Sequence, residues 1–213
     1  MSIGFLLLTD AVSSMKRDPV NLEDRIIASV KNWHKGDVFG RMISGKNASN
    51  VASIFRRKIT EHQNLCSNFD HKFCYMLLGN CEARFGSANI EWFKATVINT
   101  VSDVRFAGYD PVLVLSKTYS PPAKRKSRYV GKKVVRVPRS IDWFSECKSI
   151  FSDVSSDKSV SILECEISCP KQWDTPDAKS IEIISSLISN DIKIKTKPKS
   201  KPKKESAVVF SFS

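Results

Sequence analysis

Cysteine and histidine side chains gather in one stretch of the chain, in the order Cys66, His71, Cys74 and Cys81, with His62 just upstream. Thiolate and imidazole are the ligand types that suit tetrahedral Zn²⁺. The spacing is irregular and matches no standard zinc finger, and Cys74 lies in an apolar run, where free cysteine packs as a small hydrophobe. The sequence therefore favours buried, metal-free cysteines, keeps zinc as the alternative, and predicts no cofactor.

A second group of side chains is strongly basic. Residues 117–139 hold nine Lys and Arg and no Asp or Glu. Cations neutralise phosphates, and aromatic rings stack on unpaired bases. The pattern indicates a site for nucleic acid or another polyanion, with membrane head groups or a solvated loop as alternatives. The residues assigned to nucleic-acid binding are Tyr119, Lys124, Arg125, Lys126, Arg128, Tyr129, Lys132, Lys133, Arg136 and Arg139.

A third group is the Lys/Pro-rich C-terminal segment, residues 193–213. Its first twelve residues hold seven Lys and no acid, interrupted by Pro198 and Pro202. Like charges repel and proline lacks an amide donor, so we expect this tail to be disordered. The apolar stretch Ala207–Phe212 either adds a strand to a partner's sheet edge or stays free. Residues 124–128 and the tail are also typical of nuclear import signals, and the tail lysines assigned to import are Lys197, Lys199, Lys201, Lys203 and Lys204.

Common enzyme motifs do not occur in the sequence. It contains no Gly-rich phosphate loop, no nucleophile elbow and no dinucleotide fingerprint. It has three histidines, and no pair of carboxylates stands out by its spacing. These features favour a protein that is not an enzyme.

Composition and charge describe an ordinary globular chain with an uneven charge distribution. The 213 residues carry a net charge of +12, and 41% of them are hydrophobic. Residues 117–139 contribute +9 and residues 193–204 contribute +7, whereas residues 140–192 contribute −6. No apolar run approaches the roughly 20 residues that span a bilayer. Six cysteines in a chain of this length indicate a reducing compartment, so we expect the cytoplasm or the nucleus.

The elements that must position these groups follow from the apolar patterns. Helices are expected over residues 21–33 and 50–63, from residue 140, and from residue 175. Strands are expected over residues 3–8, 72–78, 90–101, 111–115, 129–137 and 159–168. Helices and strands do not alternate regularly in this order. The sequence therefore predicts one α+β domain over residues 1–192, with a mostly antiparallel sheet packed by a few helices, followed by the tail.

Two stretches resemble rhabdovirus matrix proteins. Phe5–Leu8 with the following helix that ends in Lys31–Trp33 is similar to that family's first strand and helix. Ile141–Phe144 with Phe151–Asp153, leading into the strand over residues 159–168, resembles its late helix–strand region. The chain lacks the family's basic, Pro-rich N-terminal arm with its budding motif. The resemblance implies a non-enzymatic virion protein that coats a nucleocapsid, self-associates and contacts acidic membrane.

The charge pattern and the resemblance lead to one function with one alternative. We expect a basic structural protein that binds RNA or nucleocapsid and associates with itself, with nuclear import receptors as further partners, in the host cytoplasm, the nucleus or the virion. The alternative is a regulatory RNA-binding protein, such as a viral suppressor of RNA silencing. Both functions use the same cations, so charge does not separate them.

Overall fold

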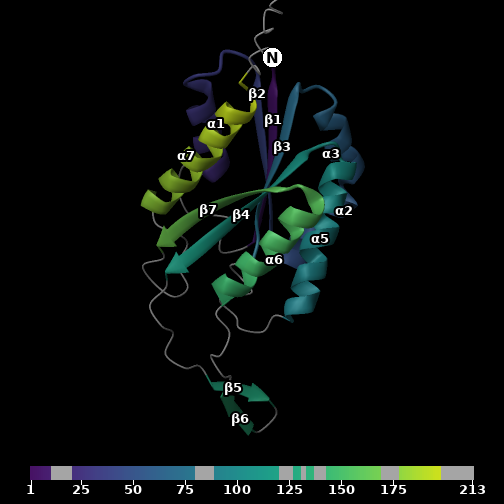
Figure 1. Ribbon diagram of the computed structural model, residues 1–213, viewed down its shortest axis with the longest axis vertical. Helices are drawn as coiled ribbons and strands as arrows, with labels where there is room; N and C mark the ends of the chain where they lie inside the picture. The colour runs from purple at the N-terminus through teal and green to yellow at the C-terminus, as the bar shows by residue number, and fades with distance from the viewer. Residues whose placement is uncertain are drawn as a thin grey trace, which may run out of the picture.

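Five strands form the central sheet of the computed structural model (Figure 1). The structure describes residues 1–10, 21–79, 89–119, 127–130, 133–136, 143–168 and 178–197. The strands of the sheet are β1 (Ile3–Asp10), β2 (Val38–Gly45), β3 (His71–Leu77), β4 (Asp110–Tyr119) and β7 (Ser161–Ser168).

The order of the strands creates one switch in winding direction. They lie in the order β2-β1-β3-β4-β7, and every neighbouring pair is parallel. The chain passes from β1 to β2 on one side and then returns to place β3 on the other side of β1. Ligands of open parallel sheets bind outside the carboxyl ends of the strands at such a switch. We therefore expect a ligand site at the carboxyl ends of β1 and β3.

Helices cover both faces of the sheet (Figure 1). On one face lie α1 (Leu22–Lys31) and α7 (Ala178–Lys195), which contact each other. On the other face lie α2 (Ala48–Arg57), α3 (Ile59–Cys66), α5 (Ile90–Phe106) and α6 (Trp143–Lys158). None of the helices in the described part of the chain is long and apolar enough to cross a bilayer.

Strand β1 shows why this sequence forms a parallel strand in the centre of the sheet. All eight of its residues are buried. Phe5 and Leu7 belong to the core under α1 and α7, whereas Leu6 and Leu8 belong to the core under α2, α5 and α6. A strand that is buried on both faces is apolar at successive positions instead of alternating. Each large apolar side chain buried in this way contributes about 1.5–3 kcal/mol.

Three helices begin with an asparagine cap near the carboxyl edge of the sheet. The side chains of Asn21, Asn47 and Asn89 accept hydrogen bonds from the backbone N–H groups of Asp24, Asn50 and Trp92. Such a cap stabilises a helix by about 1 kcal/mol relative to alanine. Helices α1, α2 and α5 each follow a strand of the sheet, so all three caps lie on the side of the sheet where the switch lies.

The expected antiparallel α+β fold is wrong, because the sheet is entirely parallel. Residues 90–101, expected as a strand, lie in α5, where Phe93, Val97 and Val101 recur at the helical spacing of four and are fully buried. Strand β2 was not expected at all. With these two changes the strands and helices alternate, which is the pattern of a doubly wound α/β fold.

Two further expectations are revised in detail. The single helix expected over residues 50–63 is two helices, α2 and α3, which meet at Lys58. The strand expected over residues 129–137 is an antiparallel hairpin of β5 (Ser127–Val130) and β6 (Lys133–Arg136), inserted between β4 and α6. Helix α7 continues to Lys195, inside the expected tail, and residues 198–213 lie outside the described residues.

The two outer strands of the sheet differ in what covers their free edges. On β2, the backbone N–H of Met42 donates a 2.7 Å hydrogen bond to Oε2 of Glu23, which belongs to α1. Burial raises the pKa of Glu23 above its ordinary value, although the bond from Met42 opposes this shift. On β7, no described strand pairs with the edge opposite β4.

Candidate functional site

Polar side chains close the carboxyl end of β1. Thr9 and Asp10 are fully buried there. The hydroxyl of Thr9 donates a 3.3 Å hydrogen bond to Oγ of Ser44 at the corresponding end of β2. A buried carboxylate is costly unless it has polar partners. We therefore identify Asp10, Thr9 and Ser44 as the described polar core of the candidate site.

Glycines let the backbone approach closely on both sides of this core. A Cβ added to Gly45, at the end of β2, would lie 2.7 Å from the backbone nitrogen of Val51 in α2. Gly79, which follows β3, has a φ of +102°, and a Cβ there would lie 3.0 Å from Phe93 Cζ and 3.1 Å from Cys147 Sγ. Only glycine adopts that backbone conformation without strain. The turn after β3 is thus fixed by backbone geometry at the switch point.

The segments that follow β1 and β3 carry further reactive side chains in the sequence. Residues 11–20 include Ser13 and Ser14, and residues 80–88 include Asn80 and Cys81. Both segments lie outside the described residues. In the sequence, residue 11 follows the last residue of β1, and residue 80 comes three positions after the last residue of β3.

All three histidines lie on the opposite side of the molecule, near the amino-terminal edge of the sheet. His71 opens β3 and pairs in register with Ile3, at the start of β1. His34 follows α1, just before β2. The carbonyl of His62 accepts a 3.2 Å hydrogen bond from the hydroxyl of Tyr109, which directly precedes β4. No imidazole is therefore available at the carboxyl edge.

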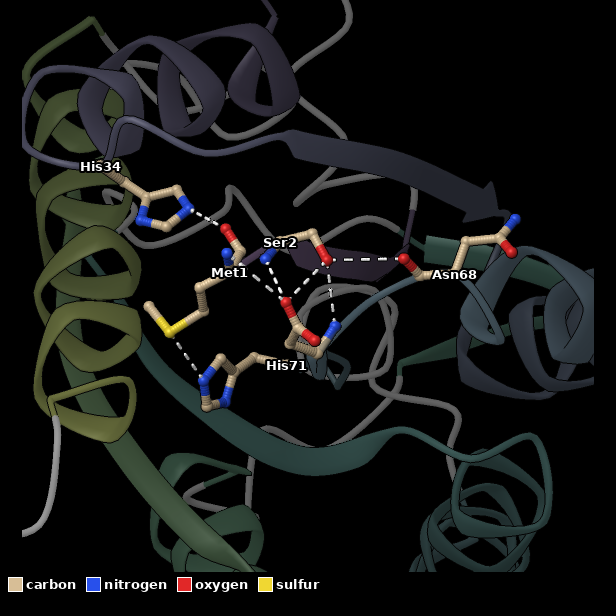
Figure 2. Close-up of polar contacts among 6 residues, drawn as sticks. Met1, Ser2, His34, Asn68 and His71 are labelled. Carbon is tan, nitrogen blue, oxygen red and sulfur yellow. Dashed lines mark hydrogen bonds and ion pairs between the residues drawn. The ribbon is translucent and has the colours of Figure 1, made fainter.

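Two of these histidines contact the first residue of the chain. Figure 2 shows His34 and His71 on two sides of Met1. The Nε2 atom of His34 donates to the carbonyl oxygen of Met1 at 2.9 Å, and Nε2 of His71 lies 3.2 Å from Sδ of Met1. The backbone N–H and the hydroxyl of Ser2 donate to Oδ2 of Asp70 at 2.6 Å and 3.1 Å. These bonds hold the pKa of Asp70 below its usual range.

His62 is fully buried. Its ring stacks on Phe55 with 4.9 Å between ring centroids. Neither ring nitrogen has a hydrogen-bond partner within the described part of the chain. Burial lowers the pKa of His62, and the cations of Arg41 and Lys58 lower it further, against the opposing charge of Glu61. The ring is therefore a core side chain, and its surroundings favour the neutral form over the protonated form.

Of the candidate zinc ligands, the structure describes the side chains of His62, His71 and Cys74. Cys74 is fully buried in β3, and burial raises the pKa of its thiol far above the ordinary value. His71 contacts Met1, and Cys81 lies outside the described residues. The described side chains contain no cluster of three or more His, Cys, Asp or Glu that could hold a metal ion.

The basic residues assigned to nucleic acid lie in the insertion between β4 and α6. Arg128 and Tyr129 belong to β5, Lys133 and Arg136 belong to β6, and Tyr119 ends β4. The other residues assigned to nucleic acid lie outside the described part: Lys124, Arg125, Lys126, Lys132 and Arg139. Of the tail lysines assigned to import, Lys197 is described, and the others lie outside the described part: Lys199, Lys201, Lys203 and Lys204. The assignment of these residues to a binding site or to nuclear import stays a prediction.

Sequence reasoning missed Asp10, Thr9 and Ser44. The available signal was the position of Asp10, two residues after the apolar run that ends at Leu8. A carboxylate directly after a buried strand marks the carboxyl edge only if the sheet is parallel. The expectation of an antiparallel sheet removed that argument.

Solved structures with a similar fold include two esterases and a GDSL-like lipase. Est24, a carbohydrate acetylesterase from Sinorhizobium meliloti, has a TM-score of 0.58 at 10% identity and covers 90% of this chain and 98% of its own. The psychrotrophic esterase EstA from Pseudoalteromonas sp. has a TM-score of 0.55 at 11% identity, and the match covers 90% of this chain and 97% of EstA. A GDSL-like lipase from Bacteroides thetaiotaomicron has a TM-score of 0.54 at 11% identity, and the match covers 91% of this chain and 88% of the lipase. No family model and no curated protein sequence matches the chain.

This likeness corrects the predictions about family and function. The fold is that of esterases, so the resemblance to rhabdovirus matrix proteins is wrong. The predicted function, a non-enzymatic matrix-like protein or a silencing suppressor, is contradicted too. The same holds for the predicted partners, which were RNA, nucleocapsid, membrane and import receptors, and for the predicted self-association. Short strand–helix patterns recur in many folds, and net charge bears on non-specific binding, not on the fold.

Proposed function

We propose that this chain is an ester hydrolase whose substrate binds in the crevice outside the carboxyl ends of β1 and β3. The observation that carries the proposal is the parallel sheet with its switch between β1 and β3. The fold matches esterases over 90% of this chain and 97% or 98% of theirs. A carboxylic ester is the substrate class that the names of these proteins share.

The described polar core supports this location. Asp10 ends β1 at the switch and is completely buried. We assign it the role of a positioning residue for the residues that follow it in the sequence. Thr9 and Ser44 join the ends of β1 and β2. The hydroxyls of Ser13 and Ser14, three and four residues after Asp10, are the nucleophile candidates that the sequence supplies next to this core.

The reaction in this chain differs from serine–histidine catalysis in one respect. The sequence Gly-Asp-Ser-Leu does not occur in it, and β1 runs instead into Thr9-Asp10-Ala11. The three imidazoles lie at the other edge of the sheet. We therefore assign a carboxylate as the group that accepts the proton of the hydroxyl or water that attacks the ester carbonyl. The sequence supplies Asp18, Glu82, Asp174 and Asp177 in the segments after β1, β3 and β7.

Hydrolysis of p-nitrophenyl acetate, butyrate and octanoate by the full chain tests the proposal. We expect release of p-nitrophenolate above the buffer rate for at least one ester. Asp10→Asn should lower kcat about 100-fold if the segment after β1 carries the nucleophile. Asp110→Asn is the matched control, because Asp110 begins β4 at the opposite edge and is exposed.

A second variant covers the case in which Asp10→Asn does not fold. Ser44→Ala removes the hydroxyl that accepts from Thr9 and should lower kcat without changing the far-ultraviolet circular dichroism spectrum. The absence of turnover with all three esters, or turnover unchanged in both variants, would contradict the proposal.

A further inference from the structure

The free edge of β7 is a second feature of the structure that suggests binding. All eight residues of β7 pair with β4, from Ser161 with Val112 to Ser168 with Tyr119. The opposite edge of β7 has no strand beside it in the described part of the chain. An open edge presents unpaired N–H and C=O groups to any extended segment that reaches it.

A groove runs beside this edge. It has a volume of about 780 Å³ and lies between the outer face of α7, the strand β7 and the start of α6. Its apolar walls come from Phe144, Cys165, Ile183 and Leu187. Ile183 is 40% exposed, a large fraction for an isoleucine next to the core. An extended segment with apolar side chains on one face would cover it.

The end of α7 lies close to the start of β7. Nζ of Lys195 donates a 2.8 Å hydrogen bond to Oγ of Ser161, so the last turn of α7 lies at the first residue of β7. Nine residues, 198–206, separate Lys197 from Ala207–Phe212. Nine extended residues span about 30 Å, and an eight-residue strand is about 26 Å long. Residues 207–212 can therefore reach every position along β7.

The chemistry of the segment matches the groove. Val208, Phe210 and Phe212 occupy alternate positions, so an extended backbone places them on one face. Residues 193–204 carry seven lysines, and residues 140–192, which include β7 and most of α7, carry a net charge of −6. Glu164, Glu182 and Lys179 line the groove itself, so its lining carries one more acidic than basic side chain. The ion pair of Glu164 with Lys148 is about half exposed and thus weak.

We propose that residues 207–212 of the same chain pair with the free edge of β7 as a sixth strand, with Val208, Phe210 and Phe212 over Ile183 and Leu187. The occupant is intramolecular because the nine-residue connection holds it near the edge at an effective concentration of roughly millimolar order. Main-chain hydrogen bonds supply the pairing, and the alternate apolar side chains supply the register.

Amide hydrogen exchange on the full chain tests the pairing. In the unaltered chain, alternate amides of residues 161–168 and amides of residues 207–212 should be protected. Phe210→Asp with Phe212→Asp should speed exchange at those positions by about tenfold or more and leave β1 and β3 unchanged. Ser211→Asp is the control, because residue 211 lies on the other face of the extended segment. Equal exchange in the unaltered and the doubly substituted chain would overturn the proposal.

A groove variant tests the same contact from the other side. Ile183→Lys should release residues 207–212 as the tail substitutions do. Phe106→Lys is its control, because Phe106 is 70% exposed on α5, across the sheet from the groove. Protection that is lost equally in both lysine variants would contradict docking in this groove.

Protein concentration separates pairing within one chain from pairing between copies. Intramolecular pairing predicts the same exchange rates at about 10 µM and about 500 µM and a monomeric mass in light scattering. Protection that increases with concentration would assign the strand to a second copy and overturn the intramolecular proposal.

Discussion

The hydroxyl of Tyr75 donates a 2.9 Å hydrogen bond to Oδ2 of Asp191, which joins the middle of β3 to the last helix. Tyr75 is fully buried, and burial raises its pKa well above the ordinary value. Nζ of Lys195 lies 2.8 Å from the same carboxylate oxygen. The three side chains fix the position of α7 on the sheet.

Removal of the Tyr75 hydroxyl should destabilise the fold. A hydrogen bond to a charged group contributes about 1.5–3 kcal/mol, so Tyr75→Phe should lower the free energy of unfolding by about that amount. Urea denaturation measures it. Tyr109→Phe is the control, because its hydroxyl donates to a neutral backbone carbonyl, and its cost should be about 0.5–1.5 kcal/mol. An equal loss in both variants would contradict a charge-assisted bond at Tyr75.

His62 should make the fold sensitive to acid. Its pKa in the folded chain lies below the ordinary 6.5, so the unfolded chain takes up this proton at higher pH than the folded chain does. The stability associated with His62 is therefore complete above 6.5 and is lost as the pH falls from 6.5 toward the folded-state pKa. His62→Leu should reduce the difference in unfolding free energy between about pH 7.5 and about pH 5. An unchanged difference would show that the fold does not lower the pKa of His62.

Ester hydrolysis should not depend on the histidines of the amino-terminal edge. His34→Gln combined with His71→Gln removes both imidazoles that contact Met1, and kcat should stay within about twofold of the unaltered chain. The pH–rate profile should also keep its shape. A loss of about 100-fold in kcat would place an imidazole in the reaction and contradict the proposed carboxylate base.

A side chain at position 79 should be poorly tolerated. Gly79→Ala combines a positive φ with close contacts to Phe93 and Cys147, so it should cost about 1–3 kcal/mol of stability. Thermal unfolding measures the loss. The reverse change at Ser159, a non-glycine residue with a φ of 51°, gives the comparison. Ser159→Gly should be neutral or stabilise the fold by up to about 1 kcal/mol.

The helices and strands whose apolar residues follow a single periodicity could be predicted from the sequence. The Asn21 cap and the apolar spacing of Leu22, Ile26 and Val30 predict α1, and the structure confirms that cap and those buried residues. The continuous apolar run predicts β1. In such segments local propensity and burial agree, so the sequence alone is sufficient.

Other elements depended on packing that the sequence does not display. Phe93, Val97 and Val101 fit one face of a helix, but every spacing is an even number, so they also fit one face of a strand. Strand β2 contains Gly40 and Arg41 and has a half-buried pattern typical of an outer strand. The site at the carboxyl edge could not be predicted for the same reason, because Thr9 and Ser44 become neighbours only when β1 and β2 are parallel and in register.

The carboxylate of Glu23 on the Met42 amide has a consequence for aggregation. Molecules polymerise by pairing of edge strands when both outer strands of each sheet are open, because each molecule can then pair with two neighbours. In this sheet a strand that approaches β2 must first displace Glu23 from Met42 and expose a half-buried carboxylate. If residues 207–212 cover β7 as proposed above, neither outer strand of the sheet is left open, and growth into a fibre by edge pairing is blocked at both ends.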